Sequence, residues 1–192
     1  KFTDYKKKIK LGISDFLRKN LPEKYIYFHL KKSIADKLNW NTESFELLFK
    51  ELLKYYDYVI FTRDIEKNMK QDSIYKKFNS IDFKKKSKNF IAANTKIILF
   101  DNIEGKDLYN TIKYSSKILA FHGMMTNLGA IEEKKIIDLW FCEIKNWNDY
   151  RNYRNAFYEF KPIYEGYDFI IPKNNMDKTI KKIRYSLKKY DR

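Results

Sequence analysis

The stretch from Ser115 to Leu139 constrains the fold of this chain more than any other. A short apolar run ends at His122-Gly123, residues 124–131 have the pattern of a short helix, and a second apolar run follows at 136–140. This order predicts strand, glycine turn, helix and strand, the repeating unit of a parallel α/β fold. Gly123 suits the turn because it lacks a Cβ, and the turn exposes backbone N–H groups at a helix start, where anions bind readily.

Apolar runs of strand length alternate with helical patterns along the chain. They lie at 25–30, 58–62, 96–100, 118–121 and 136–140. Alternation with right-handed crossovers predicts an α/β fold, a Rossmann-like doubly wound parallel sheet of about five strands in the order 3-2-1-4-5, flanked by helices. The first and fourth strands are then neighbours, and ligands bind beyond their carboxyl ends, where the winding reverses.

The segments between these runs give weaker signals. Helices are predicted at 1–20, 44–56, 65–78, 106–114 and 177–190, with Thr42 as the N-cap of the second. We expect loops at 31–41 and 80–94, and a short strand or extended segment at 168–171. His29, inside the first apolar run, is interpreted as a core histidine with its hydrogen bonds satisfied. The whole chain, 1–192, is expected to form one domain, with an N-terminal helix at 1–21 and a helical, aromatic extension at 143–192.

The net charge of +15 favours an anionic partner such as a nucleotide, a sugar phosphate, nucleic acid or an acidic membrane surface. Nearly all of the positive charge is lysine, however, and runs of lysine are often only solvated faces. The single cysteine, Cys142, excludes a disulfide within the chain and indicates a reducing compartment, so we expect a cytoplasmic protein. No apolar run approaches the ~20 residues of a membrane span. The first residue is Lys1, which leaves open that the chain is one piece of a longer protein.

Two polar loops follow the first and fourth predicted strands and are expected to face each other across one crevice. The first loop offers lysine ammonium groups and a hydroxyl, and the second offers a helix start, hydrogen-bonding side chains and a histidine ring N–H for a diphosphate. In the alternative interpretation, Thr126 only caps the helix and His122 only fills the turn. Arg63 is a candidate phosphate or ribose contact, or else a partner of Asp64. The predicted phosphate and nucleotide contacts are Lys32, Ser33, Lys37, Arg63, Glu104, His122, Gly123, Thr126 and Asn127.

Glu104 follows the third predicted strand, where a carboxylate could accept ribose hydroxyl hydrogens. Its spacing from Asp101 equally fits a capping box. Common signatures are missing: there is no G-x-G-x-x-G, no G-x-x-x-x-G-K-[ST] and no G-x-S-x-G. Two histidines and one cysteine, widely scattered, disfavour a zinc site, so we expect neither a metal nor another cofactor.

The run from Lys106 to Leu139 resembles the nucleotide-sugar half of GT-B glycosyltransferases. Xylosyltransferases and extracellular O-linked N-acetylglucosaminyltransferases have a strand, His-Gly, a few small residues, Thr-Asn, and a second strand ending in an acid. Here His122-Gly123, Thr126-Asn127 and Asp138 take those places, with a spacer one residue shorter.

The first half of the chain is more similar to bacterial heptosyltransferases. In that family a Lys-x-Trp pattern follows the first strand and loop, and its lysine touches the phosphates of the donor. The segment from Asp36 to Trp40 resembles this pattern with one inserted residue, which makes Lys37 the candidate. The later loop lacks the Asp and the final His that heptosyltransferases carry, so the likeness is to the superfamily rather than to one member.

The resemblance implies a glycosyltransferase half that binds a nucleoside diphosphate sugar and transfers the sugar without a metal, to a glycan or a lipid-linked acceptor. A second domain, from the same protein or a partner chain, would supply the acceptor groups and the catalytic base. Two alternatives stay open. The chain is a non-catalytic basic module for nucleotides or nucleic acid, or it is a scaffolding domain. The Tyr-Arg-Asn repeat at 150–155 could contribute base stacking to such a module, but a duplicated helical face is the preferred interpretation. The basic helix at 1–20 is expected to pack against the domain, although it could also contact a membrane surface.

Overall fold

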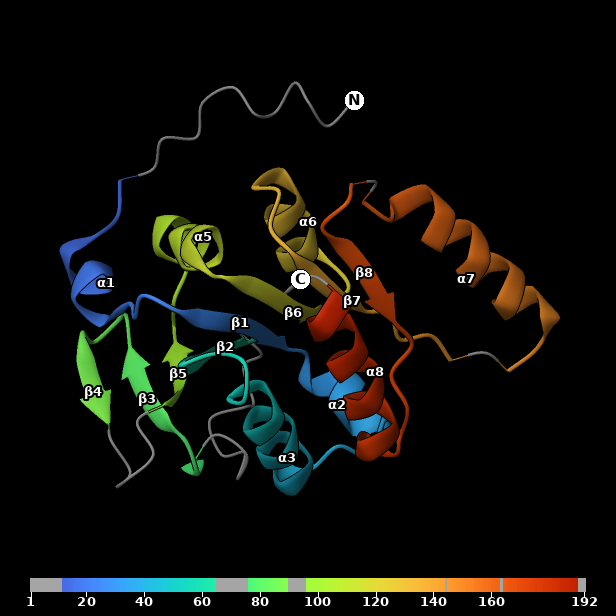
Figure 1. Ribbon diagram of the computed structural model, residues 1–192, viewed down its shortest axis with the longest axis horizontal. Coiled ribbons are helices and arrows are strands. Elements are labelled where there is room, and N and C mark those ends of the chain that lie inside the picture. The colour runs from blue at the N-terminus through green and yellow to red at the C-terminus, as the bar shows by residue number, and fades with distance from the viewer. Residues whose placement is uncertain (1–11, 65–75, 90–95, 144, 163, 190–192) are drawn as a thin grey trace.

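The computed structural model describes residues 12–64, 76–89, 96–143, 145–162 and 164–189 (Figure 1). Its centre is one eight-stranded sheet in the order β4-β3-β5-β2-β1-β6-β7-β8, in which β3 and β4 are antiparallel and all other neighbours are parallel. The strands are β1 Tyr25–Leu30, β2 Tyr58–Arg63, β3 Asn79–Asp82, β4 Ser87–Asn89, β5 Ile97–Asp101, β6 Lys117–Phe121, β7 Ile136–Leu139 and β8 Tyr167–Ile170.

The predicted α/β class and the order of the five expected strands are confirmed, because those strands are β1, β2, β5, β6 and β7 and lie as 3-2-1-4-5. The sheet is larger than predicted. β8 extends it beyond β7, and β3 and β4 extend it beyond β5, so the loop predicted at 80–94 is wrong over 80–82 and 87–89. The three residues of β4 are polar and exposed, so this strand has no apolar pattern, while Ile81 of β3 packs into the core.

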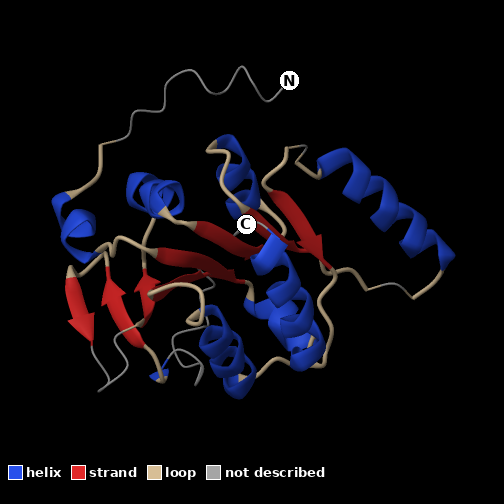
Figure 2. Cartoon of the chain, viewed as in Figure 1, coloured by secondary structure: helices blue, strands red, loops and turns tan. Residues whose placement is uncertain are grey.

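Helices cover both faces of the sheet (Figure 2). Leu17, Ile112 and Met125, from α1, α5 and α6, pack with one set of sheet residues, and side chains of α2, α3 and α8 pack with the other. Every residue of β1 is buried, because alternate side chains enter the two cores. The helices are α1 Asp15–Asn20, α2 Lys32–Lys37, α3 Thr42–Leu52, α5 Gly105–Tyr114, α6 Met124–Ile131, α7 Trp147–Phe160 and α8 Met176–Lys189.

Several local predictions need correction. The loop expected at 31–41 contains α2, whose buried Ala35 ties this short helix to the core. Asn41, rather than Thr42, is the N-cap of α3, and its side chain accepts a hydrogen bond from the Ser44 N–H at 3.0 Å. Of the helix predicted at 1–20, residues 1–11 lie outside the described residues, as do residues 65–75 of the helix predicted at 65–78.

The segment after residue 143 contributes to the body of the fold. Its β8 pairs with β7, and α8 packs against α3, where Arg184 donates two hydrogen bonds to the buried carboxylate of Glu51 at 2.7 and 2.9 Å. In the described ranges, none of the helices has the length and apolar composition that crossing a bilayer requires.

Candidate functional site

The candidate site lies where the winding of the sheet reverses, at the carboxyl ends of β1 and β6. These strands are neighbours, but the chain leaves β1 toward the face covered by α2 and leaves β6 toward the face covered by α6. Such a divergence opens a crevice between the two exit loops. Here the loops meet directly, because the Lys31 ammonium donates a hydrogen bond to the carbonyl oxygen of His122 at 2.6 Å.

Gly123 makes this close approach possible. Its backbone has φ 150° and ψ −149°, a region open essentially to glycine. A Cβ built on Gly123 would lie 2.7 Å from the Lys31 Nζ atom. Glycine is therefore required both for the turn and for the position of the ammonium group above it.

The turn opens directly into α6. Gly123 is the N-cap and has no side chain to satisfy the first N–H groups of the helix. Thr126 does not cap the helix either, since its hydroxyl donates to Asp138 at 3.2 Å. The start of α6 thus combines backbone N–H groups, the positive end of the helix dipole and the Lys31 ammonium, an arrangement that attracts an anion.

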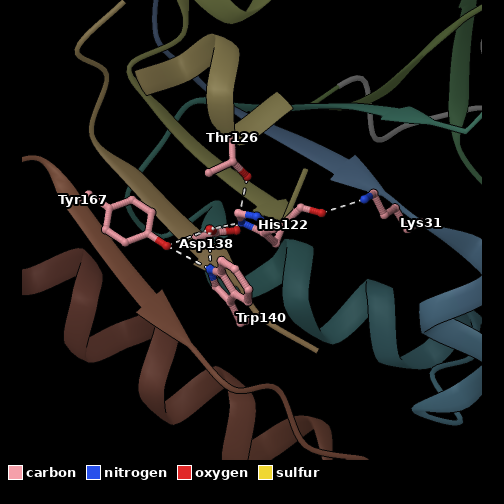
Figure 3. A network of polar contacts seen from close by, with 6 residues as sticks. All are labelled: Lys31, His122, Thr126, Asp138, Trp140 and Tyr167. Atoms are coloured by element: carbon pink, nitrogen blue, oxygen red, sulfur yellow. Dashed lines mark hydrogen bonds and ion pairs between the residues drawn. The ribbon is translucent and has the colours of Figure 1, made fainter. Parts of the chain in front are cut away.

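Asp138, on β7, is the hub of a polar network behind this turn (Figure 3). Its side chain is fully buried, and one carboxylate oxygen accepts hydrogen bonds from His122 Nδ1, Trp140 Nε1 and the Tyr167 hydroxyl, each at 2.7 Å. Burial and the nearby Asp138 carboxylate raise the pKa of Tyr167 above its ordinary value, so the phenol keeps its proton and donates.

His122 is held in one orientation. Asp138 engages its Nδ1 atom, and its ring stacks on Trp140 with 3.6 Å between the centroids. Because the carboxylate accepts from Nδ1, the Nε2 atom is left for another partner, and none is found within the described part of the chain. A ring fixed in this way can offer Nε2 to a ligand without losing rotational freedom on binding.

A cleft of about 410 Å³ adjoins His122 at the carboxyl end of β7. Trp140, Cys142 and Tyr153 are among its walls, and α7 forms one side. Burial raises the pKa of Tyr153 to about 12, with Cys142 and Asp138 adding to the shift. Burial likewise raises the pKa of the Cys142 thiol, which makes it a poor nucleophile.

The structure does not bring all of the predicted site residues together. Lys32 pairs with Asp36 within α2, and the Lys37 ammonium lies 3.2 Å from the Glu143 carboxylate. Ser33 and Asn127 are exposed. Only His122, Gly123 and Thr126 of the predicted set lie within the network around the α6 turn.

Arg63 and Glu104 lie farther along the carboxyl edge of the sheet. Arg63, at the end of β2, donates two hydrogen bonds to the Asp101 carboxylate at 3.0 and 2.9 Å, so the suggested pairing with Asp64 is wrong. Glu104 is exposed at the N-cap position of α5 but makes no capping hydrogen bond, and the capping box with Asp101 is also wrong, since that carboxylate faces Arg63.

Asp64 instead accepts from the Nε2 atom of His29 at 3.0 Å. His29 is only 4% exposed, and its Nδ1 lies 2.9 Å from the Thr62 hydroxyl oxygen. The prediction of a buried histidine with satisfied hydrogen bonds is therefore confirmed.

Four residues of the network, Lys31, Asp138, Trp140 and Tyr167, are not among the predicted contacts, although the family resemblance pointed to Asp138 as the acid at the end of the second strand. The sequence could have indicated Lys31, because it is the first residue after the predicted first strand and therefore lies nearest the crevice. Tyr167 had none, since its contact with Asp138 depends on β8 pairing with β7.

No protein-family model matches the chain, and neither does any curated protein. Solved structures with a similar fold include the UDP-GlcNAc 2-epimerase of Methanocaldococcus jannaschii in complex with UDP-GlcNAc and UDP, with a TM-score of 0.53, 17% identity, and coverage of 97% of this chain and 44% of that one. A putative UDP-N-acetylglucosamine 2-epimerase from Listeria monocytogenes gives a TM-score of 0.51 at 10% identity, covering 93% and 40%.

The chain thus spans less than half the length of these solved proteins. At such low identity the likeness concerns the fold alone, and that fold is Rossmann-like, as predicted. It does not single out the xylosyl or O-linked N-acetylglucosaminyl transferase family.

Proposed function

We propose that this chain is the half of a GT-B-type enzyme that binds the donor, a nucleoside diphosphate sugar. The observation that carries the proposal is the Lys31 ammonium lying against the glycine turn at the start of α6, at the point where the winding reverses. Two kinds of positive charge converge there, one from a side chain and one from a helix end. A diphosphate is the ligand that such an arrangement complements best.

His122 would add a third contact as an imidazolium, in which both ring nitrogens donate: Nδ1–H to Asp138, which fixes the ring, and Nε2–H to a phosphate oxygen. During sugar transfer the nucleoside diphosphate departs with growing negative charge, and fixed dipoles and cations stabilise it without moving. Lys31 and the α6 start would serve this role, so we propose transfer without a metal or other cofactor. The other half of the enzyme would supply the acceptor groups and the catalytic base.

The proposed reaction is transfer of a sugar to a glycan or lipid-linked acceptor, in the cytoplasm, where a single unpaired cysteine is chemically stable. A second candidate is epimerisation at C2 of the sugar, favoured because the similar solved structures are UDP-GlcNAc 2-epimerases. Both reactions need the same diphosphate site. The products of a reaction run in deuterated water separate the two. Transfer releases the nucleoside diphosphate to solution, whereas epimerisation returns the nucleotide sugar with deuterium at C2.

Calorimetry and thermal unfolding with UDP, GDP, ADP and CMP test the donor site. A nucleoside diphosphate at saturation should stabilise the chain by about 2 kcal/mol or more. Lys31→Ala and His122→Ala should each weaken binding by about ten- to a hundredfold, because each removes a charge-assisted contact of roughly 1.5–3 kcal/mol. Lys84→Ala, on the exposed turn between β3 and β4, is the matched control and should bind as the wild type does.

Unchanged affinity in both site variants would reject the site. Tight binding to oligonucleotides alone, falling steeply with salt, would support the basic nucleic-acid module instead.

A further inference from the structure

The outer face of α8 carries an unusual concentration of positive charge. Its inner face, including Ile180, Ile183 and Leu187, is buried in the core. The exposed positions recur at helical spacing and form one stripe, which begins at Asp177 and continues with Lys178, Lys181, Lys182, Tyr185, Lys188 and Lys189. α8 is therefore strongly amphipathic, with a lysine-rich surface directed away from the sheet.

Apolar side chains are exposed beside this stripe. Tyr185 is 73% exposed, Phe169 at the end of β8 is 42% exposed, and the following Ile171 is 40% exposed. All three border one hollow of about 490 Å³, together with Lys181 and Lys182. Large apolar side chains gathered on a surface mark a site of interaction.

The charge around the hollow is one-sided. Asp168 is the acidic residue of its lining, and its carboxylate accepts hydrogen bonds from the Ser186 hydroxyl at 2.6 Å and the Phe169 N–H at 3.0 Å. The Lys182 ammonium, which contacts the Ile171 carbonyl oxygen at 3.4 Å, stays on the rim. A partner must therefore present negative charge around an apolar centre.

We propose that this face docks onto an anionic phospholipid surface. Lipid phosphates would meet the lysines, while Ile171 and Tyr185 enter the boundary between head groups and acyl chains. Phe169, whose ring packs on Phe157 with 4.4 Å between the centroids, would lie beside them at the surface. Tyrosine suits this boundary because its ring is apolar and its hydroxyl is polar. A nucleic acid fits less well, because Ile171 offers a base neither a ring to stack on nor a hydrogen bond.

This surface is separate from the candidate donor site. None of the residues that border the hollow contacts Lys31, His122 or Asp138 through a hydrogen bond in the described part of the chain. Figure 1 shows α8 beside β8, at the opposite end of the sheet from β3 and β4. The turn between β3 and β4 therefore supplies lysines for a matched control.

Vesicle co-sedimentation of the full chain tests the proposal, with phosphatidylcholine alone and phosphatidylcholine mixed with phosphatidylglycerol. The chain should bind the mixed vesicles only. Lys181→Glu with Lys182→Glu should lower partitioning about tenfold or more, since each lysine near an anionic surface strengthens binding to it and each glutamate is repelled. Tyr185→Ser should lower it as well, because insertion is lost while the charge is kept.

The control Lys84→Glu with Lys85→Glu changes the net charge equally and should partition as the wild type does. Circular dichroism melting curves verify that every variant is folded. If the control pair lost as much vesicle partitioning, net charge alone would explain the result and the proposed docking face would be overturned. Equal binding to both vesicle types, or binding to oligonucleotides but to neither vesicle, would also overturn it.

Discussion

Asp138→Asn is the sharpest test of the network behind the α6 turn. The substitution keeps the size and shape of the side chain but removes its charge. In the position of the native carboxylate, an asparagine oxygen could still accept from His122, Trp140 and Tyr167, while its NH₂ would face the Thr126 hydroxyl, which can accept instead of donating.

The hydrogen bonds to Asp138 determine how much stability the substitution should cost. A hydrogen bond to a charged group contributes roughly 1.5–3 kcal/mol and a neutral one roughly 0.5–1.5, so four weakened bonds cost about 4 kcal/mol. Removing a fully buried charge returns part of this, because the charged side chain was desolvated on folding. We expect Asp138→Asn to lower the free energy of unfolding by about 2 kcal/mol, and Asp138→Ala by more than about 4, since all four buried donors lose the carboxylate that accepts from them.

Urea unfolding followed by circular dichroism measures both values. Asp168→Asn, whose carboxylate accepts hydrogen bonds from Ser186 and Phe169 at a half-buried site, should change stability by less than about 1 kcal/mol. If Asp138→Asn unfolds within about 0.5 kcal/mol of the wild type, the hub role assigned to Asp138 is refuted. Nucleotide affinity adds a second readout: the double variant Asp138→Asn with His122→Ala should lose no more than His122→Ala alone, because Asp138 acts through that ring.

Three further outcomes are expected. Gly129→Ala should destabilise the fold by about 1–2 kcal/mol despite its better helix propensity, because the new Cβ would lie 2.3 Å from an isoleucine methyl of β6. Gly123→Ala should cost about 1–3 kcal/mol through backbone strain and should also weaken nucleotide binding, since it displaces the Lys31 ammonium. The hydrogen bond from Arg184 lowers the pKa of Glu51 from 4.5 to about 2, so this pair stabilises the fold fully above pH 4.5 and loses its effect as the pH falls toward 2.

Chemical unfolding checks all three. Gly105→Ala, at a glycine with open space around it, controls for the loss of a glycine with positive φ but without a clash. A Gly129→Ala variant as stable as the wild type would show that the β6 and β7 side chains can move aside. For Glu51, the stability difference between wild type and Glu51→Gln should shrink as the pH is lowered from about 5 to about 3; a difference that stays constant would contradict the assigned pKa.

The chain order and the apolar runs determined the centre of the sheet. A continuous apolar run such as β1 is stable only when both of its faces are covered. The sequence predicts this burial because the residues themselves are apolar. Strand–helix alternation then fixed the order of five strands and the position of the crevice. The glycine after β6 was also legible, since a sharp turn from strand to helix has few solutions.

Only the tertiary structure decided which polar side chains meet. Arg63 donates to Asp101 rather than to its neighbour Asp64. Lys31 contacts the His122 carbonyl oxygen, whereas Lys32 and Lys37 pair with the carboxylates of Asp36 and Glu143. Apolar burial is a property of each residue and its local period, and it therefore appears in sequence. A hydrogen bond depends on the register of strands far apart in the chain. Four donors converge on Asp138 from the turn after β6, from α6, from the end of β7 and from β8, and no local pattern encodes that register.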